Sequence, residues 1–408
     1  MEQATDVEDS IKNVEKYLEQ AAEEFATAST RINKISILKN QKSLFMFRFT
    51  ILIALFLFLG CSDDTVVDNP KEAEIYFPPT DSETWENTSV SELGWNEGVL
   101  NELYDFLKTN NTRAFLILEN GRIVVEEYWG KDILNISSFD KNSKWYWASA
   151  GKSLTAVLVG IAQQEGMLSI DDKTSDYLGN GWTNMDLEKE NLITIKHQLS
   201  MTSGLNHQVG DLDCTLPECL TYGVDAGEEW FYHNAPYTLL EEVVATAADL
   251  DYNRFTAEYL GQKTGINGNW IKSGYNNIYW STARDAARFG LLIQNEGEWN
   301  GKEVVSDKSY FNAMVNTSQN LNLSYGYLWW LNGKGSVVLP GFTAPLNSSM
   351  SPHAPDELIA AMGKNGQFIE VLPSESIVVV RMGEAPGNSL LPVLFHDEMW
   401  EILMRFFN

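Results

Sequence analysis

Trp147-Ala148-Ser149-Ala150-Gly151-Lys152-Ser153 opens a stretch with apolar residues at helical spacing, which ends at Gly166. Its Ser-x-x-Lys motif places Lys152 one helical turn after Ser149 and on the same face. A serine hydroxyl is a weak nucleophile and needs a neighbouring group that removes its proton. A lysine amine can do this when desolvation or nearby positive charge lowers its pKa. The positive end of the helix dipole would also stabilise an oxyanion. The stretch therefore predicts a helix that begins with a nucleophilic serine.

Rival interpretations of this stretch fail on single residues. Gly151-Lys152-Ser153 resembles the end of a phosphate-binding loop, but that motif needs glycine where Tyr146 stands. The nucleophile elbow of α/β-hydrolases needs glycine at Trp147. Ser-x-x-Lys also occurs at residues 36–39 and 138–141, so the motif alone does not identify the nucleophile.

Two further motifs follow in order along the chain. Tyr232-His233-Asn234 leads through a proline into a helical pattern, so we expect Tyr232 on a loop. Lys364-Asn365-Gly366 lies between strand-like runs at 358–362 and 367–372, so we expect this triplet on an extended edge that can pair with a ligand. A literal Lys-Thr-Gly begins at Lys263, but there it ends a helical pattern that Gly265 would stop.

The fold class follows from where strand and helix patterns lie. Strand-like runs occupy 114–118 and 123–128, joined through Asn120-Gly121, a strong hairpin signal. Further strand-like runs end with 377–381, and 391–407 is helix-like. Mostly helical patterns lie between the two ends, at 237–248, 254–263 and 282–295. We therefore expect an α/β fold: an antiparallel sheet built from both chain ends and flanked by helices, with a large, mostly helical inserted region. A cleft between the sheet and this region would be the natural site.

These motifs together resemble the penicillin-recognising serine hydrolases. That group includes class C β-lactamases, D-alanyl-D-alanine carboxypeptidases, family VIII carboxylesterases and 6-aminohexanoate-dimer hydrolases. The resemblance spans residues 75–408 and implies a β-lactamase/transpeptidase-like fold. It is also carried by the stretches 166–172, 195–205, 281–290 and 325–330.

The resemblance implies a role for each motif residue. Ser149 would be the acylated nucleophile, and Lys152 and Tyr232 would share the proton transfers, with the identity of the base left open. Free tyrosine has a pKa of about 10, so Tyr232 would need cationic neighbours, here Lys152 and Lys364, to act as a base. Asn234 would hold the substrate amide.

The third triplet would complete the site that the resemblance implies. The backbone N–H groups of Ser149 and Gln367 would form the oxyanion hole, and Lys364 would bind a substrate carboxylate. Gly366 would allow the ligand to come close. Asn365 stands where lactamases and carboxypeptidases have Thr or Ser, which favours the esterase and amide-oligomer branches. The expected enzyme is a serine hydrolase without cofactor or metal. Its substrate, an ester, amide, D-peptide or β-lactam, is not fixed by the sequence.

The start of the chain has the features of an export signal. Basic residues precede an apolar run at 49–59, which is shorter than the roughly 20 residues that span a bilayer. Gly60-Cys61 resembles a bacterial lipobox, and the acidic residues that follow resemble the export tag of Bacteroidetes surface lipoproteins. We therefore expect an extension at 1–45, a signal peptide at 46–60 starting from Met46, and a lipidated Cys61 with a tether through residue 74. The product would be a membrane-anchored bacterial lipoprotein. The alternative is a buried apolar strand or helix.

Charge and cysteine content exclude other classes. The chain has 29 Lys and Arg against 56 Asp and Glu, a net charge of −27, and no basic stripe, which excludes nucleic-acid binding. Cys214 and Cys219 lie in a loop-like stretch, where an exported protein would form a disulfide. The five histidines show no zinc-binding spacing. The alternatives to an enzyme are a non-catalytic penicillin-binding-like module that binds cell-wall fragments, and a surface adhesion lipoprotein.

Overall fold

The computed structural model describes residues 75–386 and 392–408, and Tyr76–Asn408 form one compact unit. The expected extension at 1–45, the signal peptide at 46–60, Cys61 and the tether lie outside the described residues. None of the helices in the described part of the chain combines the length and the hydropathy that a membrane span requires.

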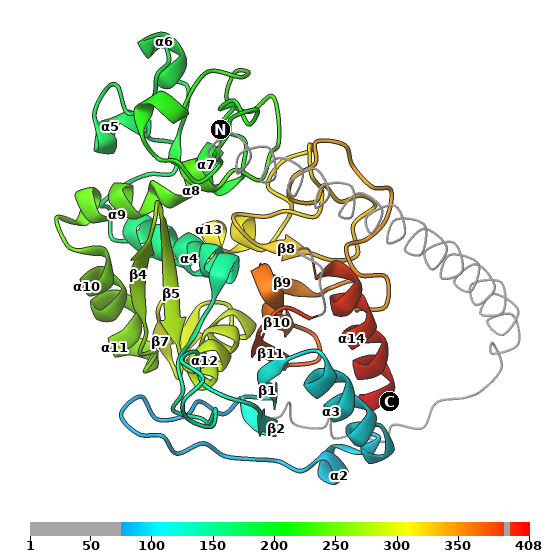
Figure 1. The fold of residues 1–408 in the computed structure, drawn as a ribbon. Helices are drawn as coiled ribbons and strands as arrows, with labels where there is room; N and C mark the ends of the chain where they lie inside the picture. The colour runs from blue at the N-terminus through cyan, green and yellow to red at the C-terminus, as the bar shows by residue number, and fades with distance from the viewer. Residues whose placement is uncertain (1–74, 387–391) are drawn as a thin grey trace, which may run out of the picture. The chain divides into compact units, whose positions relative to one another are not determined.

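The largest sheet in the described residues has six antiparallel strands, built from both ends of the unit (Figure 1). Its order is β2-β1-β11-β10-β9-β8. The strands are β1 (Thr112–Glu119), β2 (Arg122–Tyr128), β8 (Trp330–Leu331), β9 (Ile359–Gly363), β10 (Gln367–Leu372) and β11 (Ile377–Gly383). The two ends meet where β1 pairs with β11, with Leu116 opposite Val380. The predicted fold class is confirmed.

The first hairpin forms for the reason its sequence indicates. Asn120 and Gly121 both have positive φ, 47° and 78°, as a tight type I′ connection requires. A Cβ atom on Gly121 would lie 1.9 Å from the carbonyl oxygen of Tyr76, so only glycine fits beneath the incoming chain.

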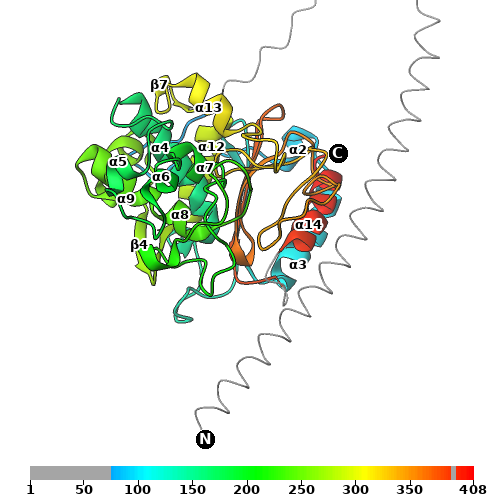
Figure 2. The ribbon, with the colours of Figure 1, turned by 90° about the horizontal axis from the view of Figure 1, so that it is seen from above.

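Helices from distant parts of the chain cover the two faces of this sheet. On one face α3 (Leu100–Thr109) and α14 (Val393–Phe406) lie side by side (Figures 1 and 2). Their buried side chains, Trp400 among them, share a core with Phe115 and Phe368. Burial of each such large apolar side chain contributes about 2 kcal/mol. On the other face lies α12 (Ala283–Gln294), capped by Thr282.

The inserted region centres on α4 (Gly151–Gln164), in which every residue from 151 to 162 is buried. A later helix, α9 (Leu240–Ala248), packs against it. The predicted helix at 254–263 is present as α10 (Tyr252–Thr256), a π-helical turn η4 (Ala257–Gly261) and α11 (Gln262–Thr264). Gly265 ends it in a left-handed conformation with φ 78°, so the assignment of Lys263 to a helix end is confirmed.

A second sheet was not predicted. Its strands follow the order β3-β5-β4, with bounds Trp145–Tyr146, Asn276–Ser281 and Asn269–Ser273. In β4 only Trp270 is buried, and its Asn and Ser residues leave no alternation of apolar and polar side chains, the pattern that predicts a strand. This sheet leads the chain directly from β3 into the Ser-x-x-Lys stretch.

The remaining elements are short. They are α2 (Val90–Leu93), η1 (Glu97–Val99), η2 (Ala148–Ala150), α5 (Ser175–Leu178), α6 (Leu187–Glu190), α7 (Ile195–Leu199), η3 (Pro217–Cys219), α8 (Asn234–Thr238), β6 (Glu298–Trp299), β7 (Lys302–Glu303), α13 (Lys308–Met314) and η5 (Lys364–Gly366).

Candidate active site

Ser149 and Lys152 lie at the start of the buried helix. Ser149 is in the single turn η2, which runs into α4, and its hydroxyl accepts a hydrogen bond from Lys152 Nζ at 3.2 Å. The residue before it, Ala148, has φ 46°, in the left-handed region that costs a non-glycine residue about 1–2 kcal/mol. Backbone strain of this kind is often concentrated at functional sites.

Lys152 is buried among aromatic rings. Lys152 is only 3% exposed. Its Nζ atom lies 4.1 Å from the ring centre of Tyr237 and 5.1 Å from that of Tyr232. Burial lowers the pKa of Lys152 from 10.5 to about 7, and the negative charge of Asp213 acts in the opposite direction. A large fraction of the molecules therefore carries a neutral amine at neutral pH.

Tyr232 lies on an irregular segment just before α8. Its ring stacks on Trp330 with 5.9 Å between ring centres. Burial raises the pKa of the Tyr232 hydroxyl well above its usual range, and a hydrogen bond with Ser149 only partly offsets this. Tyr232 is therefore an un-ionised phenol next to the Ser149 hydroxyl.

Gly363 brings the end of β9 against the serine turn. A Cβ atom on Gly363 would lie 2.4 Å from the carbonyl oxygen of Trp147 and 3.1 Å from the backbone nitrogen of Ser149. No side chain fits there, so the backbone of β9 and the turn that carries Ser149 touch directly. Sequence reasoning passed over this glycine because no motif marks it.

The expectation that the third triplet forms an extended edge is wrong. Lys364–Gly366 is not an extended edge but the helical turn η5, which joins β9 to β10. Asn365 and Gly366 have φ of 65° and 72°, the same Asn-Gly conformation that closes the first hairpin. The Asn365 side chain donates to the hydroxyl of Tyr146 at 2.8 Å.

Hydrogen bonds from the buried side chains of Gln367 and Arg381 stabilise this turn. Arg381 Nη1 donates to the carbonyl oxygens of Asn365 and Gly366, at 2.6 and 2.8 Å. The Gln367 side chain donates to the carbonyl oxygen of Gly383 at 2.6 Å and accepts from its N–H. Both side chains are buried.

A cavity of about 320 Å³ opens in front of Ser149. The polar part of its lining comes from Ser149, Tyr232 and Lys364. The rest is mostly apolar and comes from Trp330, Leu339, Pro340, Met350, Met362, Gly363, Pro392 and Val393. Of the third triplet only Lys364 lines the cavity, whereas Asn365, Gly366 and the following Gln367 do not.

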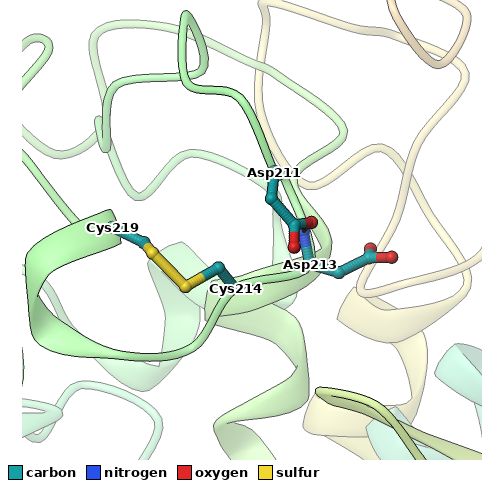
Figure 3. Close-up of a disulfide and its surroundings, with 4 residues drawn as sticks. All are labelled: Asp211, Asp213, Cys214 and Cys219. Atoms are coloured by element: carbon teal, nitrogen blue, oxygen red, sulfur yellow. Dashed lines mark hydrogen bonds between the residues drawn. A yellow bond between two sulfur atoms is a disulfide. The ribbon is translucent and has the colours of Figure 1, made fainter. Parts of the chain in front are cut away.

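Asn234 is the first residue of α8 and does not line this cavity; its side chain is bonded to Asp213, a residue that sequence reasoning missed. Its Nδ2 atom donates to Oδ1 of Asp213 at 2.7 Å, and its own Oδ1 is buried without a hydrogen-bond partner in the described residues. Asp213 immediately precedes Cys214, which forms a disulfide with Cys219 (Figure 3). The only signal for Asp213 in the sequence was this neighbouring cysteine.

Rival motif residues lie elsewhere in the described chain. Lys141 of the Ser138 motif forms an ion pair with Glu83 at 3.4 Å. Tyr310, which begins another Tyr-x-Asn, is buried and donates to the carbonyl oxygen of Ala156. Across residues 75–386 and 392–408, no three His, Cys, Asp or Glu side chains gather closely enough to hold a metal ion.

Comparisons with known proteins bear on the fold and the family of the chain. An uncharacterized protein of Alkalihalophilus pseudofirmus is 26% identical over 310 residues, 67% of this chain and 84% of the relative. A putative 6-aminohexanoate-dimer hydrolase from Bacillus anthracis superposes with a TM-score of 0.59 at 17% identity, covering 82% of this chain and 91% of that one. A putative beta-lactamase from Bacteroides dorei gives 0.58 at 15% identity, covering 77% and 99%.

At these identities the two solved structures show the fold alone. The family itself is shown by the sequence, because the beta-lactamase family description matches residues 111–389, more than half of the chain. The matched range contains the Ser149 turn, the Tyr232 segment and the Gly363–Lys364 corner. The chain therefore belongs to the beta-lactamase family, whose members are generally serine hydrolases.

Proposed function

We propose that this protein is a serine hydrolase that cleaves an ester or amide through an acyl-enzyme on Ser149. The observation that carries the proposal is the Ser149–Lys152 pair. A lysine amine lies 3.2 Å from the hydroxyl, and burial lowers the pKa of Lys152 to about 7. A general base works best when its pKa lies near the working pH, so Lys152 is assigned as the base.

Acylation begins when the neutral amine of Lys152 takes the proton of Ser149 as Oγ bonds to the substrate carbonyl carbon. The carbonyl oxygen becomes an oxyanion. We assign the oxyanion hole to the backbone N–H groups of Ser149 and Lys364, which replaces the earlier assignment to Gln367. Both are in the first turn of a helical segment, where N–H groups have no partner within the helix. Two observations support this assignment: Ser149 and Lys364 line the same cavity, and Gly363 lies directly against the turn that carries Ser149.

Tyr232 is assigned to proton transfer rather than to proton abstraction, because its raised pKa keeps it un-ionised. When the tetrahedral intermediate collapses, the bond to the leaving group breaks. Tyr232 gives its proton to that group and receives one from the Lys152 ammonium. Water then attacks the acyl-enzyme and gives a proton to Lys152, which returns it to Ser149 as the acid departs.

The cavity favours a substrate with an apolar acyl group. Its lining is dominated by side chains such as Leu339, Met350 and Met362, which offer burial and almost no hydrogen bonds. Lys364 is exposed at the same cavity and can attract a substrate carboxylate. An ester or amide of an apolar acid, with or without a distant carboxylate, fits this lining better than a polar peptide.

The direct test combines labelling and turnover. A fluorophosphonate probe should modify Ser149, and Ser149→Ala should lose both the label and about 10³-fold or more of the turnover. The substrate panel is p-nitrophenyl butyrate, nitrocefin and a D-Ala-D-Ala peptide, with the butyrate ester expected to turn over fastest. Ser138→Ala is the matched control, since it removes the serine of the rival motif. Loss of labelling in Ser138→Ala but not in Ser149→Ala would overturn the proposal.

A further inference from the structure

We propose that Asp213 is a positioning residue for the hydrolytic site: it fixes the Asn234 amide and supplies the negative charge that stabilises Lys152 while that lysine carries a proton. The inference rests on the proposed acyl-enzyme function, with Lys152 as the base. It assigns a role to a loop residue that belongs to none of the three motifs.

The hydrogen bond between Asn234 and Asp213 sets the orientation of the amide. Nδ2 of Asn234 donates to Asp213 Oδ1 at 2.7 Å, and a carboxylate can only accept, so Nδ2 must point to Asp213 and Oδ1 must point away from it. That Oδ1 is buried and unpaired in the described residues. A buried acceptor without a partner is destabilising, so we expect a donor such as a substrate N–H to complete the arrangement.

Asp213 is bonded to the helix that covers Lys152: it accepts from Asn234, the first residue of α8, and the ring centre of Tyr237 in the same helix lies 4.1 Å from Nζ. Its negative charge opposes the effect of burial on Lys152. The groups that face Lys152 are the Ser149 hydroxyl and the rings of Tyr232 and Tyr237, all of them uncharged. Acylation puts a positive charge on this buried amine, which burial alone opposes. An anion on the neighbouring loop lowers the cost of that intermediate.

A second titratable group faces Asp213 but stays neutral. His233 is buried, and burial together with the nearby His207 lowers its pKa to about 4, with Asp213 acting in the opposite direction. Above pH 5 His233 is therefore uncharged and does not take the charge of Asp213 away from Lys152. A pH profile in the neutral range therefore reports on Lys152 rather than on His233.

The loop that carries Asp213 is held on both sides. The N–H of Asp213 donates to Oδ1 of Asp211 at 2.9 Å, and the Cys214–Cys219 disulfide closes the chain immediately after it (Figure 3). Ala235 N–H donates to the carbonyl oxygen of Leu212 at 3.0 Å, which ties the loop to α8. The carboxylate is thus placed by a covalent and a hydrogen-bonded support, as a positioning residue requires.

The test is the pH dependence of Asp213→Asn, measured with p-nitrophenyl butyrate and as the rate of fluorophosphonate labelling. Asparagine can still accept from Asn234, but it carries no charge. Without that charge Lys152 loses its proton more easily, so the acidic limb of the pH–rate profile, where Lys152 becomes protonated, should move to lower pH by about one unit. The plateau rate should fall about tenfold, because the amine is then a weaker base. Asp213→Glu should restore the wild-type limb.

The matched control is Glu218→Gln, which removes an exposed carboxylate from the same disulfide loop. It should leave the limb in place. An unchanged limb in Asp213→Asn, whatever its plateau rate, would overturn the inference, since a purely structural role lowers the rate without moving the limb. That result leaves the proposed function intact, whereas a wild-type protein that neither hydrolyses the ester nor takes the label overturns both.

Discussion

Gly363 and Trp147 touch through their backbones: a Cβ atom on Gly363 would lie 2.4 Å from the Trp147 carbonyl oxygen. This contact joins the end of β9 to the turn before the nucleophile helix. The two N–H groups assigned to the oxyanion hole therefore come from segments more than 200 residues apart, 149 and 364, that share one point of contact. At this contact there is no room for the methyl group of an alanine at position 363.

Gly363→Ala should separate the two N–H groups and reduce kcat by about 10²-fold, comparable to the loss of one oxyanion donor. The overpacked methyl group should also cost about 1–3 kcal/mol of stability. Gly210→Ala is the control, because a Cβ atom there meets nothing within 4 Å. Steady-state kinetics and thermal unfolding of both variants check this, and a Gly363→Ala enzyme with wild-type kcat would contradict the oxyanion assignment.

Lys152→Met should abolish turnover yet stabilise the fold at low pH. The pKa of Lys152 is about 7 in the folded protein against 10.5 ordinarily, so between these values the unfolded state binds more protons and wild-type stability rises with pH. Below pH 7 the buried amine is charged and its cost is fully present. At pH 6 the methionine variant should therefore be more stable by roughly 4–5 kcal/mol, since each tenfold change in proton affinity corresponds to about 1.4 kcal/mol.

Urea unfolding at pH 6 and pH 10 measures this difference. It should shrink at the higher pH, where the wild-type amine is neutral. Lys302→Met replaces an exposed lysine and should show no such pH dependence. Equal effects of the two substitutions would mean that Lys152 is not buried in its charged form.

Acyl-chain length should govern the rate on p-nitrophenyl esters until the cavity is full. Each methylene buried among the apolar lining contributes about 0.8 kcal/mol, or about fourfold in kcat/KM. Met350→Ala enlarges the cavity and should move the optimum to longer chains. Met314→Ala, buried away from the cavity in α13, should lower stability and leave the optimum unchanged. A flat chain-length profile would exclude the cavity as the acyl site.

Substitution of Lys364 should lower activity far more than substitution of Lys263, although both residues begin Lys-x-Gly triplets. Lys364→Ala removes a cation at the cavity and should lower kcat/KM by about 10²-fold for esters that bear a carboxylate, and by only a few-fold for neutral esters. Lys263→Ala lies at a helix end and should change stability by less than about 0.5 kcal/mol, with activity unaffected. The reverse ranking in one assay would overturn the assignment.

The sequence predicted the sheet and the nucleophile helix because both rest on local signals. Alternating apolar residues around Asn120-Gly121 and apolar residues at helical spacing after Ser149 define their elements without knowledge of the rest of the fold. The second sheet was missed because β4 buries a single side chain, Trp270, and shows no alternation.

The third motif shows where local reasoning was incomplete. Flanking strands were recognised, but Asn365-Gly366 is itself a turn signal, and it places the motif on a hairpin turn instead of an edge. Asp213 and Gly363 were not assigned a role, because their importance comes from contacts with residues far along the chain. Asp213 acts on Lys152, 61 positions earlier, and Gly363 on Ser149, 214 positions earlier.

Two parts of the site, α4 and the segment that contains Leu339 and Pro340, should differ in the free energy needed to expose their backbone to solvent. Residues 151–162 are all buried, so their amide hydrogens should exchange only when the whole unit unfolds. Leu339 and Pro340, which line the acyl cavity, lie on an irregular segment outside helices and strands. Backbone of that kind opens locally, at a much smaller free energy. Substitutions in this segment can therefore change which substrate is accepted while the Ser149–Lys152 pair keeps its geometry, and new specificities can arise without rebuilding the catalytic machinery.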